Sequence, residues 1–196
     1  MLSVLDTLDD RWVHAETLKR LPDVTAAKDF NRAIAFVQSV SSKATDEAVA
    51  AAIARLAPTA RLSGIVRRYI RRADHFPSHP LHADDDMRPL ISARDFIEAA
   101  RRYRNCLASM IDRALIGQVA FAEFRGEAII ELRPLTLDRG WLLDAVHVAR
   151  NAHVPSALAE EVERKCAAIG IPSFDQRDTG EDWRRYVRLV RDSGPA

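Results

Sequence analysis

The feature that most constrains the fold of this chain is a change of hydrophobic periodicity at Gly117. Before it, apolar residues recur at the spacing of amphipathic helices. After it, residues 118–124 alternate loosely between apolar and polar. Gly126 then provides a tight turn into a second apolar run. The sequence therefore predicts two strands, near 118–125 and 127–133, that pair as an antiparallel hairpin.

The first 75 residues are predicted to be helical, because capping residues and prolines divide them into amphipathic segments. Asp9 or Asp10 caps a first helix that ends before Pro22. Thr45 caps a later helix that ends at Pro58. The expected helices are 11–21, a segment that opens at Thr25, the segment from Thr45 to Pro58, and about 59–73.

Residues 76–89 break this pattern, since they contain three prolines and the acidic run Asp84–Asp86. They are predicted to form a linker or surface loop. The linker divides a helical N-terminal region, 1–75, from a core, 90–173.

Ser92 and Asp95 open the core in the arrangement of a capping box, with Asp in place of the usual Glu or Gln. The helix that follows has two possible ends. It either continues unbroken through Cys106, or it gives way there to a second helix, 106–116, capped by Asn105.

A third strand is expected from Trp141 to Val148, followed by a helix over 156–169 and a C-terminal helix and tail over 174–196. One face of this strand is predicted to carry Trp141, Leu143, Ala145 and His147. The sequence thus predicts an α+β fold, in which a helical N-terminal half packs on a small three-stranded antiparallel sheet flanked by helices.

Basic and acidic residues nearly balance at a net charge of +1, but 25 of the 29 basic residues are arginine. The planar guanidinium group suits recognition of phosphate and carboxylate. A GC-rich genome would also raise the arginine and alanine content. The composition alone therefore does not identify a binding partner.

Two cysteines, 60 residues apart and without a Cys-x-x-Cys motif, indicate free thiols in a reducing cytoplasm. No apolar run approaches the roughly 20 residues needed to cross a bilayer, and the first residues lack the pattern of a signal peptide. A cytoplasmic protein without a membrane partner is expected.

The sharpest charge pattern lies in the predicted helix over 59–73. At about 100° per residue, its apolar side chains share one arc and five arginines share the opposite arc, with no acidic residue among them. These are Arg61, Arg67, Arg68, Arg71 and Arg72. The stripe predicts contact with nucleic-acid phosphates or an acidic protein surface. Alternatively, the stripe is a plainly solvated face, or it pairs with carboxylates of the same chain, such as Asp84–Asp86. A second basic stretch, Trp183 to Arg188, is interpreted as a helix docked on the core.

Cys106 is the candidate nucleophile. If Asn105 caps a helix, the thiol lies in its first turn, where the helix dipole and nearby arginines favour the thiolate. His147 and Asn151 could complete a papain-like catalytic group. The favoured alternative is a structural cysteine, buried beside the sheet among apolar residues at near-helical spacing.

A metal site is a further hypothesis for the linker. His75, His79, His82 and Asp84 have ligand types and spacings that a metal ion could use. The prolines and the acidic run describe a solvated loop equally well, and no second cluster would complete the site. No metal is therefore expected.

Residues 91–171 carry a series of short motifs: Asn105-Cys106-Leu107, Gly117, the strand Ile129–Leu132, Trp141 and Asn151. In this order they resemble the PcfJ-like family, whose members are found on conjugative plasmids and other mobile elements. The family commonly has histidine directly before the cysteine, where this chain has Asn105. The resemblance implies an accessory role in DNA mobilisation, without an established catalytic activity.

Together these patterns favour a non-enzymatic accessory protein of a mobile element, which contacts nucleic acid or a protein bound to it through the arginine-rich helix. One alternative is a cysteine-dependent hydrolase that uses Cys106 with His147. Another is an inhibitor or interaction module without a nucleic-acid role. No Walker motif, glycine-rich dinucleotide loop or His-Glu-x-x-His motif occurs, so no cofactor is expected.

Overall fold

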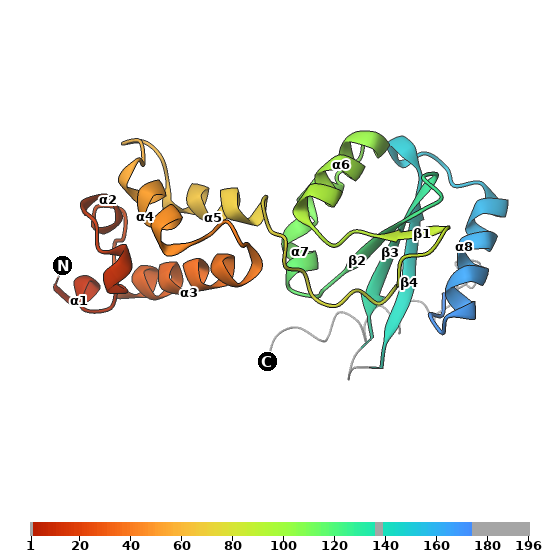
Figure 1. Ribbon diagram of the computed structural model, residues 1–196, viewed down its shortest axis with the longest axis horizontal. Coiled ribbons are helices and arrows are strands. Elements are labelled where there is room, and N and C mark those ends of the chain that lie inside the picture. The colour runs from red at the N-terminus through yellow and green to blue at the C-terminus, as the bar shows by residue number, and fades with distance from the viewer. Residues whose placement is uncertain (1, 136–138, 174–196) are drawn as a thin grey trace. The chain divides into compact units, whose positions relative to one another are not determined.

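The computed structural model describes residues 2–135 and 139–173. The chain forms two compact units, and we describe each by itself (Figure 1). Unit 1 comprises Met1–Phe76 and Ile91–Asp95, whereas unit 2 comprises Pro77–Leu90 and the chain from Phe96 onward. The predicted C-terminal helix and tail, including the stretch around Trp183, lie outside the described residues. Within the described ranges, every helix is too short or too polar to span a bilayer.

Unit 1 is helical, as predicted, but its first helix differs from expectation. Its elements are α1 (Leu2–Leu5), the 3-10 helix η1 (Asp10–Trp12), α2 (Ala15–Leu18), α3 (Val24–Val40), α4 (Asp46–Ala54) and α5 (Leu62–Ile70). The single helix expected over 11–21 is wrong, because the backbone of His14 is extended. Its ring Nδ1 instead caps α2 by accepting a hydrogen bond from the backbone N–H of Glu16 (3.1 Å). Thr45 caps α4 as predicted.

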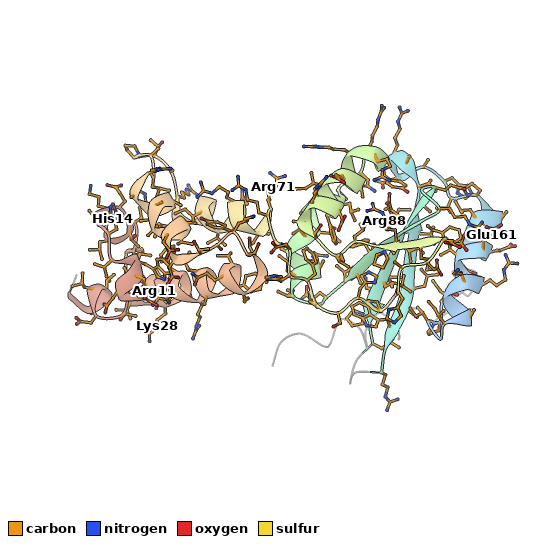
Figure 2. All side chains as sticks on the ribbon, in the orientation of Figure 1. Arg11, His14, Lys28, Arg71, Arg88 and Glu161 are labelled. Atoms are coloured by element: carbon orange, nitrogen blue, oxygen red, sulfur yellow. The ribbon has the colours of Figure 1, made fainter. Side chains whose placement is uncertain are left out.

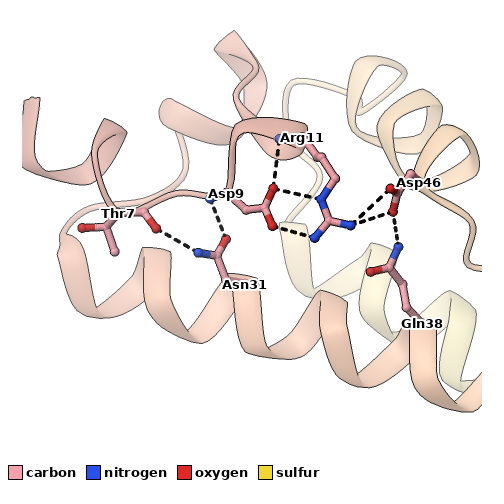
Figure 3. Close-up of polar contacts among 6 residues, drawn as sticks. All are labelled: Thr7, Asp9, Arg11, Asn31, Gln38 and Asp46. Atoms are coloured by element: carbon pink, nitrogen blue, oxygen red, sulfur yellow. Dashed lines mark hydrogen bonds and ion pairs between the residues drawn. The ribbon is translucent and has the colours of Figure 1, made fainter.

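The core of unit 1 is a cluster of apolar side chains to which its helices contribute together. Trp12, Ile34, Val37 and Ile53 are almost completely buried in it. At the surface, Arg11 joins η1 to α4 by pairing with Asp9 (2.6 Å) and Asp46 (3.0 Å) (Figure 3). Because these groups are largely exposed, the pairs orient η1 more than they stabilise it.

Unit 2 is built on an antiparallel sheet in the order β1-β2-β3-β4. Its strands are β1 (Met87–Pro89), β2 (Ala120–Phe124), β3 (Ala128–Pro134) and β4 (Trp141–His147). The predicted hairpin is confirmed by the pairing of β2 with β3, in which Ala122 lies opposite Ile130. The predicted number of strands is wrong, because β1 lies inside the segment expected to be a linker. A three-residue edge strand that includes Pro89 is too short to show alternation, and proline is tolerated at a sheet edge.

The two faces of this sheet are covered by different helices. On one face, which we call the apolar face, β3 residues Ile130 and Leu132 pack against Val162 and Cys166 of α8 (Ser156–Ala168). On the other, which we call the mixed face, Phe121 of β2 meets Phe96 of α6 (Ala93–Tyr103) edge to face, with ring centroids 5.7 Å apart. Figure 1 shows α8 on one side of the sheet and α6 with α7 (Ile111–Leu115) on the other.

The segment after α6 follows neither of the two arrangements expected for it. Arg104 adopts a left-handed conformation (φ 50°), which ends α6 at Tyr103. The side chain of Asn105 then accepts a hydrogen bond from the backbone N–H of Leu107 (3.1 Å) and starts a short 3-10 helix, η2 (Leu107–Ser109). The expected single helix 106–116 is therefore divided into η2 and α7.

Candidate functional site

A small pocket lies against the mixed face of the sheet and has about 70 Å³ of space. Its lining includes Asn105, Cys106, Glu131, His147 and Asn151, together with apolar side chains such as Phe121. Three of these residues, Cys106, His147 and Asn151, are the group that the sequence suggested as catalytic. They come from the loop after α6, the end of β4 and the 3-10 helix η4 (Ala149–Asn151).

Cys106 is exposed, so the prediction that it is buried beside the sheet is wrong. The prediction rested on helical spacing that continued through Tyr103 to the cysteine. Because Arg104 is left-handed, the helical phase is lost directly after Tyr103. Leu107 turns into the core instead, and the thiol is left beside the pocket.

His147 reaches the pocket because of an irregularity between β3 and β4. Glu131 lies opposite Ala145, but Leu132 lies opposite Leu143, so Asp144 is an extra residue in β4. Side chains alternate between faces along a strand, and one extra residue reverses the phase. The expectation that Trp141, Leu143, Ala145 and His147 share one face is therefore wrong. Trp141 and Leu143 pack on the apolar face, whereas His147 lies on the mixed face opposite Ile129.

Glu131 is a functional candidate that sequence reasoning missed. It is 7% exposed and accepts hydrogen bonds from Nε2–H of His147 (2.9 Å) and from Arg133 (2.8 Å). Burial opposes its ionisation, but the hydrogen bond from His147 and the charge of Arg133 outweigh burial and hold the pKa of Glu131 below its usual value. In the sequence, Glu131 is marked only by being a single acidic residue within an otherwise apolar strand.

The backbone on two sides of the pocket adopts conformations that ordinary side chains disfavour. Arg104, directly before Asn105 and Cys106, has φ 50°, and Arg150 and Asn151 have φ 62° and 51°. Left-handed residues other than glycine are uncommon and gather at binding and catalytic sites. Here they place Cys106 and Asn151 at the same pocket.

The arrangement combines an exposed thiol, an imidazole and a buried carboxylate. The carboxylate of Glu131 holds the proton on Nε2 of His147, so the neutral ring carries its lone pair on Nδ1. Within the described residues, no hydrogen bond joins Cys106 to His147. The thiol and the imidazole therefore line the same pocket without being paired with each other.

Two residues of the metal hypothesis, His79 and Asp84, have other partners in the structure. Nδ1 of His79 accepts from the N–H of Leu81 (3.1 Å), and Nε2 donates to the carbonyl of Phe121 (2.9 Å). Burial lowers the pKa of His79. Asp84 pairs with Lys165 (2.8 Å). His75 and His82 are exposed. No group of three or more His, Cys, Asp or Glu side chains in the described ranges is placed to hold a metal ion.

The second candidate is the arginine stripe of unit 1, which we call the arginine surface. It consists of Arg61, Arg67, Arg68, Arg71 and Arg72, all of which are exposed, and Figure 2 labels Arg71 at the end of α5. The opposite arc of α5 is buried through Leu62, Ile65 and Tyr69. The guanidinium group of Arg68 also lies over the ring of Tyr69, 5.4 Å from its centroid.

Two of the three carboxylates that the sequence offered as internal partners of this surface have partners within unit 2. Asp84 and Asp86 pair with Lys165, and Asp86 also pairs with Arg125 (2.7 Å). Among the described residues of unit 1, no carboxylate forms an ion pair with the arginine surface. Within unit 1 the arginine surface is therefore left without an acidic partner.

Comparison of the chain with protein-family models, with curated proteins and with solved structures found no match in any of the three. The arguments about function therefore rest on the pocket and the arginine surface themselves.

Proposed function

We propose that this protein is an accessory protein that binds nucleic acid through the arginine surface of unit 1. The observation that carries the proposal is that five neighbouring arginine side chains are exposed, with no carboxylate partner among the described residues of unit 1. In this proposal, unit 1 binds nucleic acid and need not catalyse a reaction. The mobile-element context implied by the resemblance to the PcfJ-like family is part of the same proposal.

The physical reason is the match between guanidinium groups and phosphates. Each phosphate that an arginine neutralises releases condensed counterions, so binding is favoured at low salt and weakens as salt is added. The apolar arc of α5 is buried in the core, which holds the helix in place while its charged arc faces outward. Interleaved aromatic side chains are absent from this arc, since Tyr69 is buried. Backbone contact with a duplex is therefore favoured over base stacking.

The test is the salt dependence of binding to a labelled DNA duplex, measured by fluorescence anisotropy. Arg67→Ala combined with Arg71→Ala should weaken binding and reduce the slope of log K against log salt by about 2, because two phosphate contacts are lost. Thermal stability should change by less than about 1 kcal/mol, since exposed charges contribute little to folding.

The matched control is Arg32→Ala combined with Arg55→Ala. Both arginines are exposed in unit 1 and outside the arginine surface, so this variant removes the same charge. Its binding should stay close to that of the parent protein. Equal losses in the two double variants would show that net charge alone drives binding. Absence of binding at low salt would overturn the nucleic-acid proposal and leave an acidic protein as the partner to test.

A further inference from the structure

We propose that the pocket of unit 2 is a thiol-dependent acyl-transfer site, at which Cys106 accepts a short acyl group from a carboxylic ester or amide and passes it to water. The inference does not rest on the arginine surface, which belongs to unit 1. It rests on an exposed thiol, an imidazole and a buried carboxylate that the fold brings to one small pocket. The limited space, about 70 Å³, suits a short acyl group rather than a long chain.

The reaction that these groups can perform has two steps. In the first, the sulfur of Cys106 attacks the carbonyl carbon and forms a thioester, while its proton moves to His147. The bond from the carbonyl carbon to the leaving oxygen or nitrogen breaks, and the leaving group takes that proton from His147. In the second step, water attacks the thioester and gives a proton to His147. The carbon–sulfur bond breaks, the carboxylic acid leaves, and His147 returns its proton to the sulfur, which restores the thiol of Cys106.

His147 is suited to this proton transfer by its tautomer. Its Nε2–H donates to Glu131, so Nδ1 is the nitrogen that can accept a proton. Glu131 is a positioning residue, since it touches His147 and not the pocket thiol. Its own position is fixed by Arg133, which also pairs with Asp144 (2.6 Å), the extra residue of β4. The irregularity that turns His147 into the pocket is thus held by the same ion-pair network.

Cys106 is also suited to the role of nucleophile by its backbone. The left-handed Arg104 ends α6 before it, and the side chain of Asn105 is occupied by the N–H of Leu107. The backbone N–H of Cys106 has no hydrogen-bond partner among the described residues. An N–H of this kind beside the attacking sulfur is the usual donor to the oxyanion that forms on the attacked carbonyl.

The test uses the full chain and p-nitrophenyl acetate as the probe. We expect a burst of nitrophenolate, one acetyl group on Cys106 by peptide mass spectrometry, and slow loss of that acetyl group to water. Acetylation should be at least 10-fold faster than that of glutathione under the same conditions. Cys106→Ser should abolish the burst. A rate for Cys106 no faster than that of glutathione would overturn the proposal without requiring any variant.

Two substitutions test the roles of the partners. His147→Gln keeps an N–H donor for Glu131 but removes the base, and should slow acetylation by about 100-fold. The matched control, His153→Gln, changes an exposed histidine outside the pocket and should leave the rate unchanged. Glu131→Gln should slow acetylation less and shift its pH dependence, because an amide does not stabilise the imidazolium. If His147→Gln folds and acetylates within twofold of the parent rate, His147 is not the base and the proposed site fails.

Discussion

The two faces of the sheet in unit 2 differ in composition, although the same strands build both. The apolar face buries side chains such as Ile130, Leu132 and Cys166 against α8. The mixed face buries Phe121, but it also buries two carboxylates, Glu123 and Glu131, which are 3% and 7% exposed. Burying a charge costs several kcal/mol unless it is paired. The apolar face therefore stabilises unit 2 by burying apolar side chains, whereas the mixed face buries apolar side chains together with carboxylates that need partners.

The two buried carboxylates of the mixed face differ in what holds them. Glu123 is paired by two guanidinium groups, those of Arg88 and Arg102. Burial and the charge of Glu123 also raise the pKa of Tyr103 to about 12. Glu131 is paired by one arginine and by a histidine that lines the pocket. The pairing of Glu123 thus uses guanidinium groups alone, whereas that of Glu131 also includes the imidazole that lines the pocket.

The largest expected effect of a substitution lies on the apolar face. Ile130→Ala removes a fully buried side chain from the centre of the sheet and should lower the free energy of unfolding by about 2–5 kcal/mol. Urea denaturation followed by circular dichroism measures it. The control, Ile169→Ala, truncates a side chain that is 52% exposed and should cost less than about 1 kcal/mol. Similar losses in both variants would contradict the close packing of Ile130 on the apolar face.

Much of the fold could be predicted because its signals are local. Thr45 caps α4 through a contact three residues away, and the hairpin of β2 and β3 follows from alternation on both sides of Gly126. The same local rules failed where a single residue adopts a backbone conformation that interrupts a helical pattern. The extended backbone of His14 divides a helix, and the left-handed Arg104 places Cys106 outside the core.

The site was less predictable than the fold because its geometry depends on pairing between distant segments. The sequence could suggest Cys106, His147 and Asn151 by residue type. It could not show that Asp144 is an extra residue in β4, since that follows only from the register against β3. Without this extra residue, the alternation of side chains along β4 would place His147 on the apolar face, away from Glu131.

The next effect, intermediate in size, is the pH dependence of the stability that Glu131 contributes to the folded state. The pKa of Glu131 is lowered in the folded state from its ordinary 4.5, so the unfolded chain binds a proton at higher pH than the folded one does. The stability that Glu131 contributes is therefore fully present above pH 4.5 and is lost as the pH falls through the lower, folded-state pKa. Glu131→Gln should be less stable than the parent above pH 4.5, and the difference should shrink as the pH falls below 4.5.

Urea midpoints at a series of pH values measure this difference. Other carboxylates with lowered pKa, such as Asp9 and Asp46, remain in both proteins and cancel in the comparison. The control is Glu127→Gln, a change at an exposed position beside the hairpin turn, which should alter the free energy of unfolding by less than about 0.5 kcal/mol at neutral pH. If the gap for Glu131→Gln were constant from pH 7 to pH 3, its destabilisation would come from packing and not from the charge shared with His147 and Arg133.

The smallest energetic effect, and the sharpest contrast in accessibility, concerns the two thiols. Cys166 is fully buried on the apolar face, where burial raises its pKa to about 11. Cys106 is exposed beside the pocket. Because the thiolate is the reactive form, N-ethylmaleimide at neutral pH should modify Cys106 quickly and Cys166 only when unit 2 opens. Mass spectrometry should find a first adduct on Cys106 within minutes, and urea should accelerate the formation of a second adduct on Cys166.

Cys106→Ser should change the free energy of unfolding by less than about 0.5 kcal/mol, since an exposed thiol packs little apolar surface. Equal rates of modification for the two thiols in the native protein would mean that the apolar face is no better closed than the pocket, and the contrast between the two faces would fail.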